Sequence, residues 1–464
     1  MAEMRTPKLD GRDWLGRGGL MGDPWVAFPS HLAGIATRVQ VYSLSALWLT
    51  FALQYFLWQL PLLALLLVPD AGKCYMRACT AFDRLAMPAV LCVPYSWCGF
   101  RVHTSDSDLM ATMSEKGSSV VMTNHGSRVD WLVGMLLGRV VRPGVRVGFV
   151  AEVTTMLMPV FGWSRGLFGD IFLRRTFHKD AARIRANVEA FRTAGVDRMI
   201  FLAPEGAIVD PGVPGDLEYV RQCGDFMRAS GREPLGHLLT PRYKGVHLIT
   251  QHAPDAVFSV TMAFRCRGFD HALDLRDRVS VVDGVATGGI NCSLRLDDPK
   301  RVVPDLHTIF RGGLHVFCDI RRLESLKPGS NADVVRDTLL EDYERKDKLL
   351  AHFEATGLMA PGKKMKPLPI FHAQMNLTLA AHLAFSKMAL QLACGTTATS
   401  FATLVLTTWL VIFALHSVTH LYAEKISGAS RESLLFETVL KAMMQKYMGK
   451  LDHGGASKDA KKTQ

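Results

Sequence analysis

The segment TNHGSRVDW at residues 123–131 places a histidine and an aspartate at a spacing that suits acid–base chemistry. His125 and Asp130 are five residues apart, between the β-branched run 118–123 and an apolar run that begins at Trp131. Across such a strand-to-helix turn, Asp130 can fold back and accept a hydrogen bond from one ring nitrogen of His125. That contact would fix the imidazole tautomer and leave the other nitrogen as a general base.

The motif by itself leaves three other interpretations open. Ser127 could act as an enzyme nucleophile, although an acceptor substrate can bring its own hydroxyl. Asp130 could simply cap the helix that follows it. His125 and Asp130 could also bind a metal, but no third ligand stands at a fixed spacing, so we predict no metal and no bound cofactor.

A second block, MIFLAPEGAI at residues 199–208, reads as a buried strand followed by Pro204, Glu205 and Gly206. A carboxylate directly after an apolar strand is expected to point into a cleft at the strand tip. A surface turn is the ordinary alternative for such a triplet.

Between the two blocks, residues 158–177 carry Phe172 and the pair Arg174 and Arg175. An arginine beside an active-site cleft suits a phosphate, which it can bind through two charge-assisted hydrogen bonds. A solvated helix or strand face is the ordinary alternative for the two arginines.

In order and spacing these blocks resemble the glycerophospholipid acyltransferase family, and within it the 1-acylglycerol-3-phosphate and lysocardiolipin-type acyltransferases. The resemblance covers about residues 99–362. Its motifs are NHGSRVDWL, FGWSRGLFGDIFLRR, APEG, HLLTPRYKG, AVFSVTMAF, LHVFCDIRRL and YERKDKLLAHFEATG. It implies transfer of a fatty acyl chain from acyl-CoA to the free hydroxyl of a lysophospholipid, with acyl-CoA as a co-substrate.

The resemblance also implies a role for individual residues. His125 would be the base, Asp130 its orienting partner and Arg175 the ligand of the acceptor phosphate. The further substrate-binding positions would be Phe172, Pro204, Glu205, Gly206 and Arg242. The family's usual Pro-Glu-Gly-Thr, often followed by Arg, is replaced here by Ala207 and Ile208 after the glycine. We therefore expect a lysolipid with a diester headgroup to be preferred over lysophosphatidic acid.

Two rival functions use the same sequence features. A hydrolase or a CoA-independent transacylase could employ the same His–Asp pair, and the loss of the threonine at Ala207 would suit an inactive lipid-binding scaffold. Intact His125, Asp130, Arg175 and Glu205 argue against the scaffold, which has no use for all four.

The elements that must position these residues follow from the apolar pattern. Short β-branched or apolar runs occur at 118–123, 145–150, 199–203, 257–264 and 314–320, with helical periods between them. Strands that alternate with helices predict an α/β domain over residues 99–363, with a mostly parallel sheet and flanking helices. One such helix has apolar residues at Ile184, Val188 and Phe191 and a glycine, Gly195, that ends it.

The chain is 48% hydrophobic, and two charge-free stretches account for the excess. Residues 39–69 are long enough to cross a bilayer and longer than the apolar core of a secretory signal. Residues 399–421 form a second predicted span, whereas 369–385 could be a poorer span or a helix in the interface. The expected layout is a flexible tail (1–38), a transmembrane anchor (39–69), a membrane-associated helical segment (70–98), the catalytic domain (99–363), a C-terminal membrane region (364–424) and a basic tail (425–464).

A net charge of +11 suits an anionic surface. Because the sequence has predicted spans and no nucleic-acid-binding motif, we expect the partner to be the lipid bilayer and not nucleic acid. The nine cysteines form no CxxC pair and indicate reduced thiols that face the cytosol. Because acyl-CoA and lysolipids meet at the endoplasmic reticulum, the resemblance predicts a bitopic or multi-pass membrane protein of that organelle. Acidic residues in the first 38 positions argue against a mitochondrial transit peptide.

Overall fold

The computed structural model describes residues 30–67, 72–104, 113–114, 117–157, 160–174, 177–213, 215–252, 255–267, 279–282, 284–368, 372, 374–381 and 383–384. Its helical elements are α1 (Ser30–Gln59), η2 (Leu60–Leu67), α2 (Gly72–Cys92), η3 (Val93–Trp97), α4 (Asp130–Val141), η4 (Val153–Leu157), α5 (Phe161–Leu167), α6 (Phe177–Ala194), α7 (Asp216–Ala229), α8 (Tyr243–His252), α9 (Leu306–Arg311) and α10 (Ala332–Thr356). Its strands are β1 (Arg101–Thr104), β2 (Ser119–Thr123), β3 (Arg146–Glu152), β4 (Ile171–Leu173), β5 (Arg198–Leu202), β6 (Ala256–Cys266), β7 (Ser280–Val282), β8 (Val285–Thr287), β9 (Ile290–Asn291), β10 (His315–Arg322) and β11 (Lys366–Pro367).

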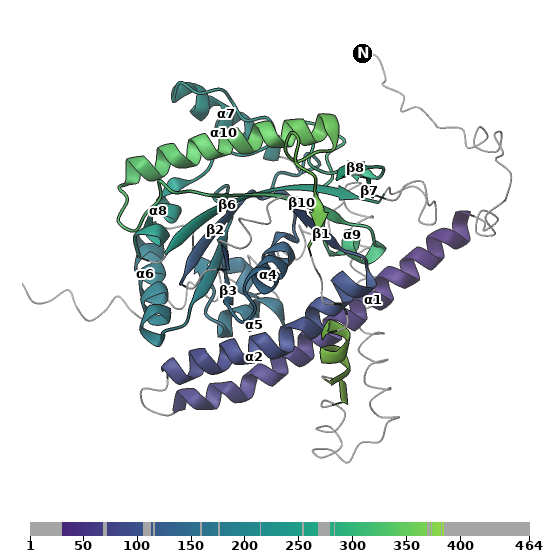
Figure 1. Ribbon diagram of the computed structural model, residues 1–464, viewed down its shortest axis with the longest axis vertical. Helices are drawn as coiled ribbons and strands as arrows, with labels where there is room; N and C mark the ends of the chain where they lie inside the picture. Colours follow the sequence, from purple (N-terminus) through teal and green to yellow (C-terminus); the bar gives the residue numbers. More distant parts are fainter. Residues whose placement is uncertain are drawn as a thin grey trace, which may run out of the picture.

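One large sheet organises the domain, with the strand order β11-β1-β10-β6-β2-β5-β3-β4 and β9 beside β6. Figure 1 labels β1, β10, β6, β2 and β3 of this sheet. The neighbours from β6 to β4 are parallel, as are β1 and β10. Antiparallel pairing occurs between β10 and β6 and at the short strands β9 and β11. The predicted α/β class with a mostly parallel sheet is confirmed. Helices such as α4 and α6 return the chain between the parallel strands, as parallel pairing requires.

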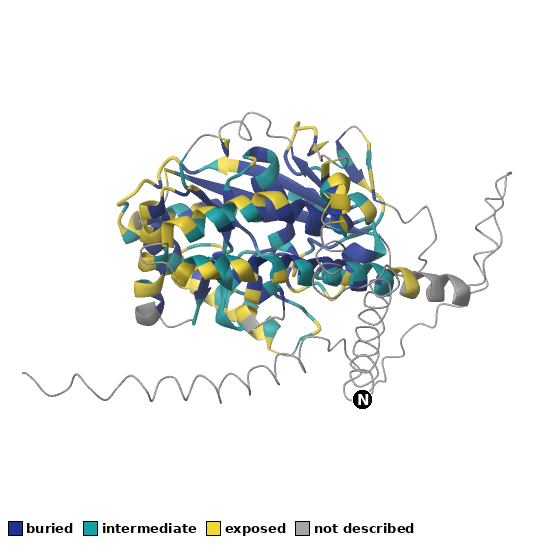
Figure 2. Ribbon diagram, turned by 90° about the horizontal axis from the view of Figure 1, so that it is seen from below, coloured by how far each residue is buried: buried dark blue, intermediate teal, exposed yellow. Residues whose placement is uncertain are grey.

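Both faces of the sheet are covered. In β2, Val120 and Met122 join the core with residues of α6, α8 and α10, whereas Val121 joins the core with residues of α4, α1 and α2. Alternate side chains of a strand point to opposite faces, so a strand buried on both sides is apolar throughout. The central strands β2 and β5 are accordingly buried along their length, beneath helices whose outer faces are exposed (Figure 2).

The helix predicted before Gly195 is α6. Ile184, Val188 and Phe191 are all buried, and Gly195 follows the helix with φ of 63°. Glycine adopts this left-handed conformation without steric cost, so the helix ends there.

The N-terminal apolar segment differs in detail from its prediction. α1 begins at Ser30, inside the predicted tail, and the α-helix changes to a 3₁₀ helix at Leu60. Pro61 explains the change, because proline has no N–H to donate and its ring clashes with the preceding helical turn. In the described part of the chain, Val39–Leu67 is the one segment long and apolar enough to cross a membrane.

One face of α1 packs against the rest of the protein. Trp48 and Tyr55 are buried, and their polar atoms bond to α2: the Trp48 indole donates to the Val90 carbonyl at 3.0 Å, and the Tyr55 hydroxyl donates to Asp83 at 2.6 Å. α1 and α2 thus run side by side along the domain (Figure 1). The large exposed apolar side chains on the remainder of α1 and η2 are Val39, Leu57, Leu60, Leu66 and Leu67.

A buried ion network joins this helical hairpin to the sheet. Asp83 of α2 lies 3.5 Å from Arg139 of α4 and 3.8 Å from Arg146 of β3. Arg165 of α5 holds Asp170 through two hydrogen bonds of 2.6 and 2.8 Å. Because removing one partner would leave an unpaired buried charge, this network ties α2 firmly to the domain.

Only part of the predicted C-terminal membrane region lies within the described residues. The predicted span 399–421 lies outside the described residues. Of the weaker candidate, Met375 and Leu379 are buried in the main core, and Asn376 accepts a hydrogen bond from Trp97 at 3.0 Å. The sheet itself extends past the predicted domain end at 363, because β11 pairs with β1.

Candidate active site

His125 and Asp130 meet at the tip of β2. The Nδ1 atom of His125 lies 2.8 Å from Asp130 Oδ2, with the imidazole 30% exposed and the carboxylate 11% exposed. The contact engages Nδ1 and orients the ring, so that any base function falls to Nε2. The structure therefore brings this predicted pair together in the arrangement of a base and its orienting carboxylate.

The helix-cap alternative for Asp130 is not what the structure shows. Val129 precedes the first helical turn and α4 has no side-chain cap there, while Asp130 uses its second oxygen, Oδ1, to accept a hydrogen bond from Ser127 at 2.5 Å. The Ser127 hydroxyl also accepts the Val129 N–H at 3.1 Å. Because its proton is directed to Asp130 and not to His125, Ser127 serves as a second orienting group and is not placed as a nucleophile.

Glu205 does not project into a cleft as expected. It is 2% exposed, and its carboxylate accepts the backbone N–H of His125 at 2.8 Å and that of Leu239 at 3.1 Å. Burial raises the pKa of Glu205, and the two N–H donors oppose that shift. The reason lies in the register: Met122 of β2 pairs with Leu202 of β5, so the residues that follow the two strand tips are neighbours.

Asn124 has a structural task beside the histidine. It is 2% exposed, its amide donates to the Met262 carbonyl at 2.9 Å, and its carbonyl accepts the Met262 N–H at 2.7 Å. The side chain thereby continues the pairing between β2 and β6 beyond the end of β2. This fixes the start of the loop that carries His125.

Two residues of α10 support the same strand tip, and the sequence did not single them out. The fully buried Lys346 donates to the carbonyls of Met122 and Val260 at 3.2 Å each, and the Tyr343 hydroxyl donates to the Thr123 carbonyl at 3.4 Å. Burial lowers the pKa of Lys346, although nearby carboxylates partly offset this. The available signal was a lysine at helical spacing from the apolar residues Leu339, Tyr343 and Leu350, on the face of α10 that is buried.

The predicted substrate residues around the second block fall into one cluster. Gly206 turns with φ of 67°, and a side chain there would contact Arg242. The backbone N–H of Arg242 donates to Pro204 at 2.9 Å, and its exposed guanidinium donates to the Tyr219 hydroxyl at 2.6 Å. The structure therefore places an exposed cation beside the turn that follows β5.

The structure gives fewer contacts for the remaining predicted residues. Phe172 is 5% exposed within β4, and Arg175 lies outside the described residues. The backbone N–H of Arg174 donates to Asp180 at 2.8 Å. Ala207, where a threonine was expected, packs with Val209 and other apolar side chains.

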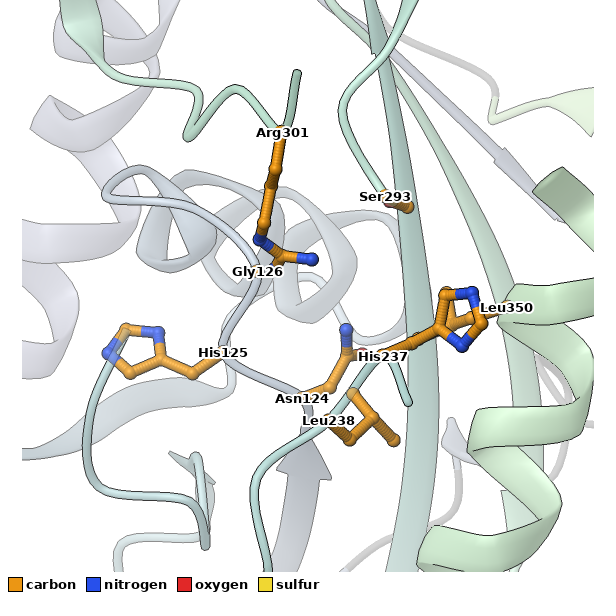
Figure 3. A pocket seen from close by; sticks show the side chains of 8 residues that line it. All are labelled: Asn124, His125, Gly126, His237, Leu238, Ser293, Arg301 and Leu350. Atoms are coloured by element: carbon orange, nitrogen blue, oxygen red, sulfur yellow. The ribbon is translucent and has the colours of Figure 1, made fainter. Parts of the chain in front are cut away.

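A small pocket adjoins the histidine loop on the side opposite the imidazole (Figure 3). It has a free volume of about 10 Å³ and is lined by Asn124, His125, Gly126, His237, Leu238, Ser293, Arg301 and Leu350. His237 Nε2 lies 2.8 Å from Glu354, and although burial opposes its protonation, Asp347 and Glu354 raise the pKa of His237. Among the described residues no group of three histidine, cysteine or carboxylate side chains could hold a metal ion.

Comparison with known proteins gives one family match and several relatives of low identity. Residues 102–263 match the acyltransferase family. The chain is 25% identical over 153 residues to mouse 1-acyl-sn-glycerol-3-phosphate acyltransferase epsilon. The aligned region covers 32% of this chain and 41% of that protein. It is 24% identical over 243 residues to the probable 1-acyl-sn-glycerol-3-phosphate acyltransferase 5 of Arabidopsis thaliana. That aligned region covers 51% of this chain and 54% of the relative.

A third relative is an uncharacterized acyltransferase of Schizosaccharomyces pombe, 22% identical over 256 residues, which covers 53% of this chain and 63% of that protein. The matches thus span about half of the length of these relatives. The region that matches the acyltransferase family, residues 102–263, contains the His125–Asp130 pair and most strands of the sheet.

Proposed function

We propose that this protein transfers a fatty acyl chain from acyl-CoA to the free hydroxyl of a lysophospholipid at a membrane. The observation that carries the proposal is the 2.8 Å contact between His125 and Asp130 at the tip of a parallel strand. The family match and the two relatives whose names specify 1-acylglycerol-3-phosphate support the class of acceptor.

In the mechanism that we propose, Nε2 of His125 removes the proton of the acceptor hydroxyl as its oxygen attacks the thioester carbonyl. The carbon–sulfur bond then breaks, and the thiolate takes the proton back from the imidazolium. Asp130 stabilises the imidazolium through Nδ1, and Ser127 holds the carboxylate in place. General-base catalysis of this kind contributes typically about 10²–10⁴-fold.

Direct transfer is favoured over an acyl-enzyme route because Ser127 directs its proton to Asp130. A hydrolase or a CoA-independent transacylase could still use the same pair, and both are outcomes that the assay below separates. Burial of Glu205, Asn124 and Lys346 around one loop argues against an inactive scaffold, since each orders the backbone beside the histidine.

A membrane location suits both substrates. The segment Val39–Leu67 can span a bilayer by length and composition, and its leucines Leu60, Leu66 and Leu67 are exposed on the protein. Tyr55 and Trp48 attach the same segment to the catalytic domain, so that the site would stay close to the lipid surface. Because acyl-CoA and lysolipids meet at the endoplasmic reticulum, we propose that membrane as the location.

The test measures the transfer of labelled acyl groups from acyl-CoA by the purified protein in detergent. A panel of lysophospholipids serves as acceptors, and a separate reaction contains water as the sole acceptor. We expect labelled diacyl phospholipid from wild type and none above background from His125→Ala. If labelled free fatty acid were released without a lipid acceptor as fast as with one, the protein would instead be a hydrolase. Transfer from a phospholipid donor without acyl-CoA would show a transacylase.

A further inference from the structure

Arg301 is a buried cation that lacks a carboxylate partner in the described part of the chain. Its side chain is 8% exposed, and the described residues place no carboxylate oxygen within ion-pair distance of it. One guanidinium nitrogen donates to the Leu294 carbonyl, but Nε is buried without a hydrogen-bond partner. Burial lowers the pKa of Arg301, as expected for an uncompensated charge. Buried charges in proteins are normally paired, but the described residues supply no counter-ion to this guanidinium.

The two described carboxylates whose charge acts on Arg301 are already engaged. Glu205 accepts the N–H groups of His125 and Leu239, and Asp210 lies 3.5 Å from Arg128. Both carboxylates raise the pKa of Arg301 from a distance, without offsetting the effect of burial. The positive charge of Arg301 is therefore available to a ligand.

The guanidinium lines the small pocket beside the histidine loop. Figure 3 shows Arg301 reaching over Gly126 toward Asn124 and His237, while the His125 ring points away on the other side of the loop. The pocket has a free volume of about 10 Å³, room for one oxygen atom or water, within a hollow of about 230 Å³ that is open to solvent.

A second donor faces the same space. Ser293 is 6% exposed, and its hydroxyl accepts the Phe264 N–H at 2.7 Å, which leaves its own proton to donate. His237 also lines the pocket, but its ring nitrogens lie 2.8 Å from Glu354 and 3.5 Å from Asp347, which would balance any charge on the ring. A cation and a hydroxyl donor around a space for one oxygen form a binding site for an anionic oxygen.

We propose that Arg301 and Ser293 bind an oxygen of a substrate phosphate, from either the lysolipid headgroup or the CoA moiety. The identity of the phosphate-bearing substrate rests on the proposed function. Residues 124–126 form a wall of the pocket and also carry the base, so a phosphate held here is placed relative to the imidazole.

Thermal unfolding of the purified full chain in inorganic phosphate, against chloride of equal ionic strength, tests the site without catalysis. We expect phosphate to raise the unfolding midpoint of wild type and of Lys300→Met, a matched control at an exposed neighbouring cation. Arg301→Met should lose the phosphate shift, and Arg301→Lys should keep part of it. In chloride, Arg301→Met should unfold at no lower temperature, because an apolar side chain replaces an unpaired buried charge.

Kinetics then distinguish the two phosphate sources. If the lysolipid supplies the phosphate, Arg301→Met should raise the acceptor KM at least about tenfold and leave the acyl-CoA KM unchanged. If CoA supplies it, the acyl-CoA KM should rise instead, while transfer from acyl-pantetheine, which has no phosphate, should be unaffected.

Either kinetic pattern supports the site. An equal phosphate shift in Arg301→Met and wild type overturns it, as does a lower midpoint in chloride for both Arg301→Met and Arg301→Lys, which would mean that the cation is structural. If wild type transfers no acyl chain, the proposed function fails, and the phosphate shift alone still decides the role of Arg301.

Discussion

The carboxylate of Glu205 accepts the backbone N–H of His125 at 2.8 Å and thereby ties the loop after β5 to the loop that carries the base. Glu205 also accepts the Leu239 N–H with its other oxygen and is only 2% exposed, so its carboxylate is not accessible to substrate in this arrangement. We therefore assign it a positioning role, which can be separated from direct substrate binding.

Glu205→Gln replaces one acceptor with an NH₂ group that faces a backbone N–H. The unmet buried donor should cost about 1–3 kcal/mol, which we expect to appear as a lower unfolding midpoint and a kcat reduced at least about tenfold. The KM values should change little, because the substrate contacts stay in place. The exposed Glu233→Gln serves as the control. A rise in acceptor KM with unchanged kcat would return Glu205 to substrate binding.

Substitutions of the residues around the imidazole should divide into two classes. Asp130→Asn should reduce kcat severely, because an amide cannot stabilise the imidazolium and favours the wrong tautomer. Ser127→Ala should retain more than about a tenth of wild-type turnover, since it removes one of the contacts that hold Asp130. Single-turnover rates with saturating acyl-CoA measure both. Complete loss in Ser127→Ala, together with a trapped acyl-serine in wild type, would establish the covalent route instead.

Arg175 remains our proposed ligand for the acceptor phosphate at the family's position. Losing such a charge-assisted contact should cost about 1.5–3 kcal/mol, so Arg175→Ala should lower kcat/KM for the lysophospholipid about ten- to a hundredfold. Arg175→Lys should restore only part, because a point charge cannot replace the guanidinium fork. Arg174→Ala is the matched control, because its backbone contact to Asp180 survives the substitution. The reverse pattern, in which Arg174→Ala raises the acceptor KM, would refute the assignment.

Membrane association should depend on the exposed side of the N-terminal segment. The protein should stay in the membrane fraction after an alkaline carbonate wash and need detergent for release. Replacing Leu60, Leu66 and Leu67 by serine should weaken retention without unfolding the domain, because these side chains are exposed. Leu217→Ser, an exposed leucine of α7, should have no effect. Full recovery of the wild type in the carbonate supernatant would show that this segment does not cross the bilayer.

A histidine pair should make stability fall in acid. His103 Nε2 lies 3.0 Å from His315 Nδ1; burial, His315 and Arg101 lower the pKa of His103 to about 3, and burial and Arg101 lower that of His315 to about 4. Between these values and the ordinary pKa of about 6.5, the unfolded chain binds protons that the folded chain does not. The two neutral rings therefore make their full contribution to stability above about pH 6.5, and this contribution is lost as the pH falls below that value.

Between pH 7.5 and 5.0 the pair should lose about 4 kcal/mol of unfolding free energy, roughly 2 kcal/mol for each ring. Unfolding midpoints at the two pH values measure the loss. In His315→Gln the midpoints at pH 7.5 and 5.0 should differ less than in wild type. A wild-type midpoint that is unchanged or higher at pH 5.0 would show that the two rings are protonated in the fold.

The sequence alone determined the features that depend on local pattern. The apolar runs placed β2, β3, β5, β6 and β10 and the α/β class, because strands buried on both faces must be apolar throughout. The spacing of His125 and Asp130 determined their contact, since five residues across one turn leave little freedom. The charge-free stretch likewise indicated the helix α1.

Tertiary structure decided what each polar group does once the chain is folded. Glu205 was expected in a cleft, but the parallel register of β2 and β5 brings it to the backbone of His125 instead. Lys346 and Arg301 reach the same site from 221 and 176 residues further along the chain, counted from His125. No local pattern encodes such distant meetings, because they depend on how the sheet orders its strands and on which buried donors and charges remain to be paired.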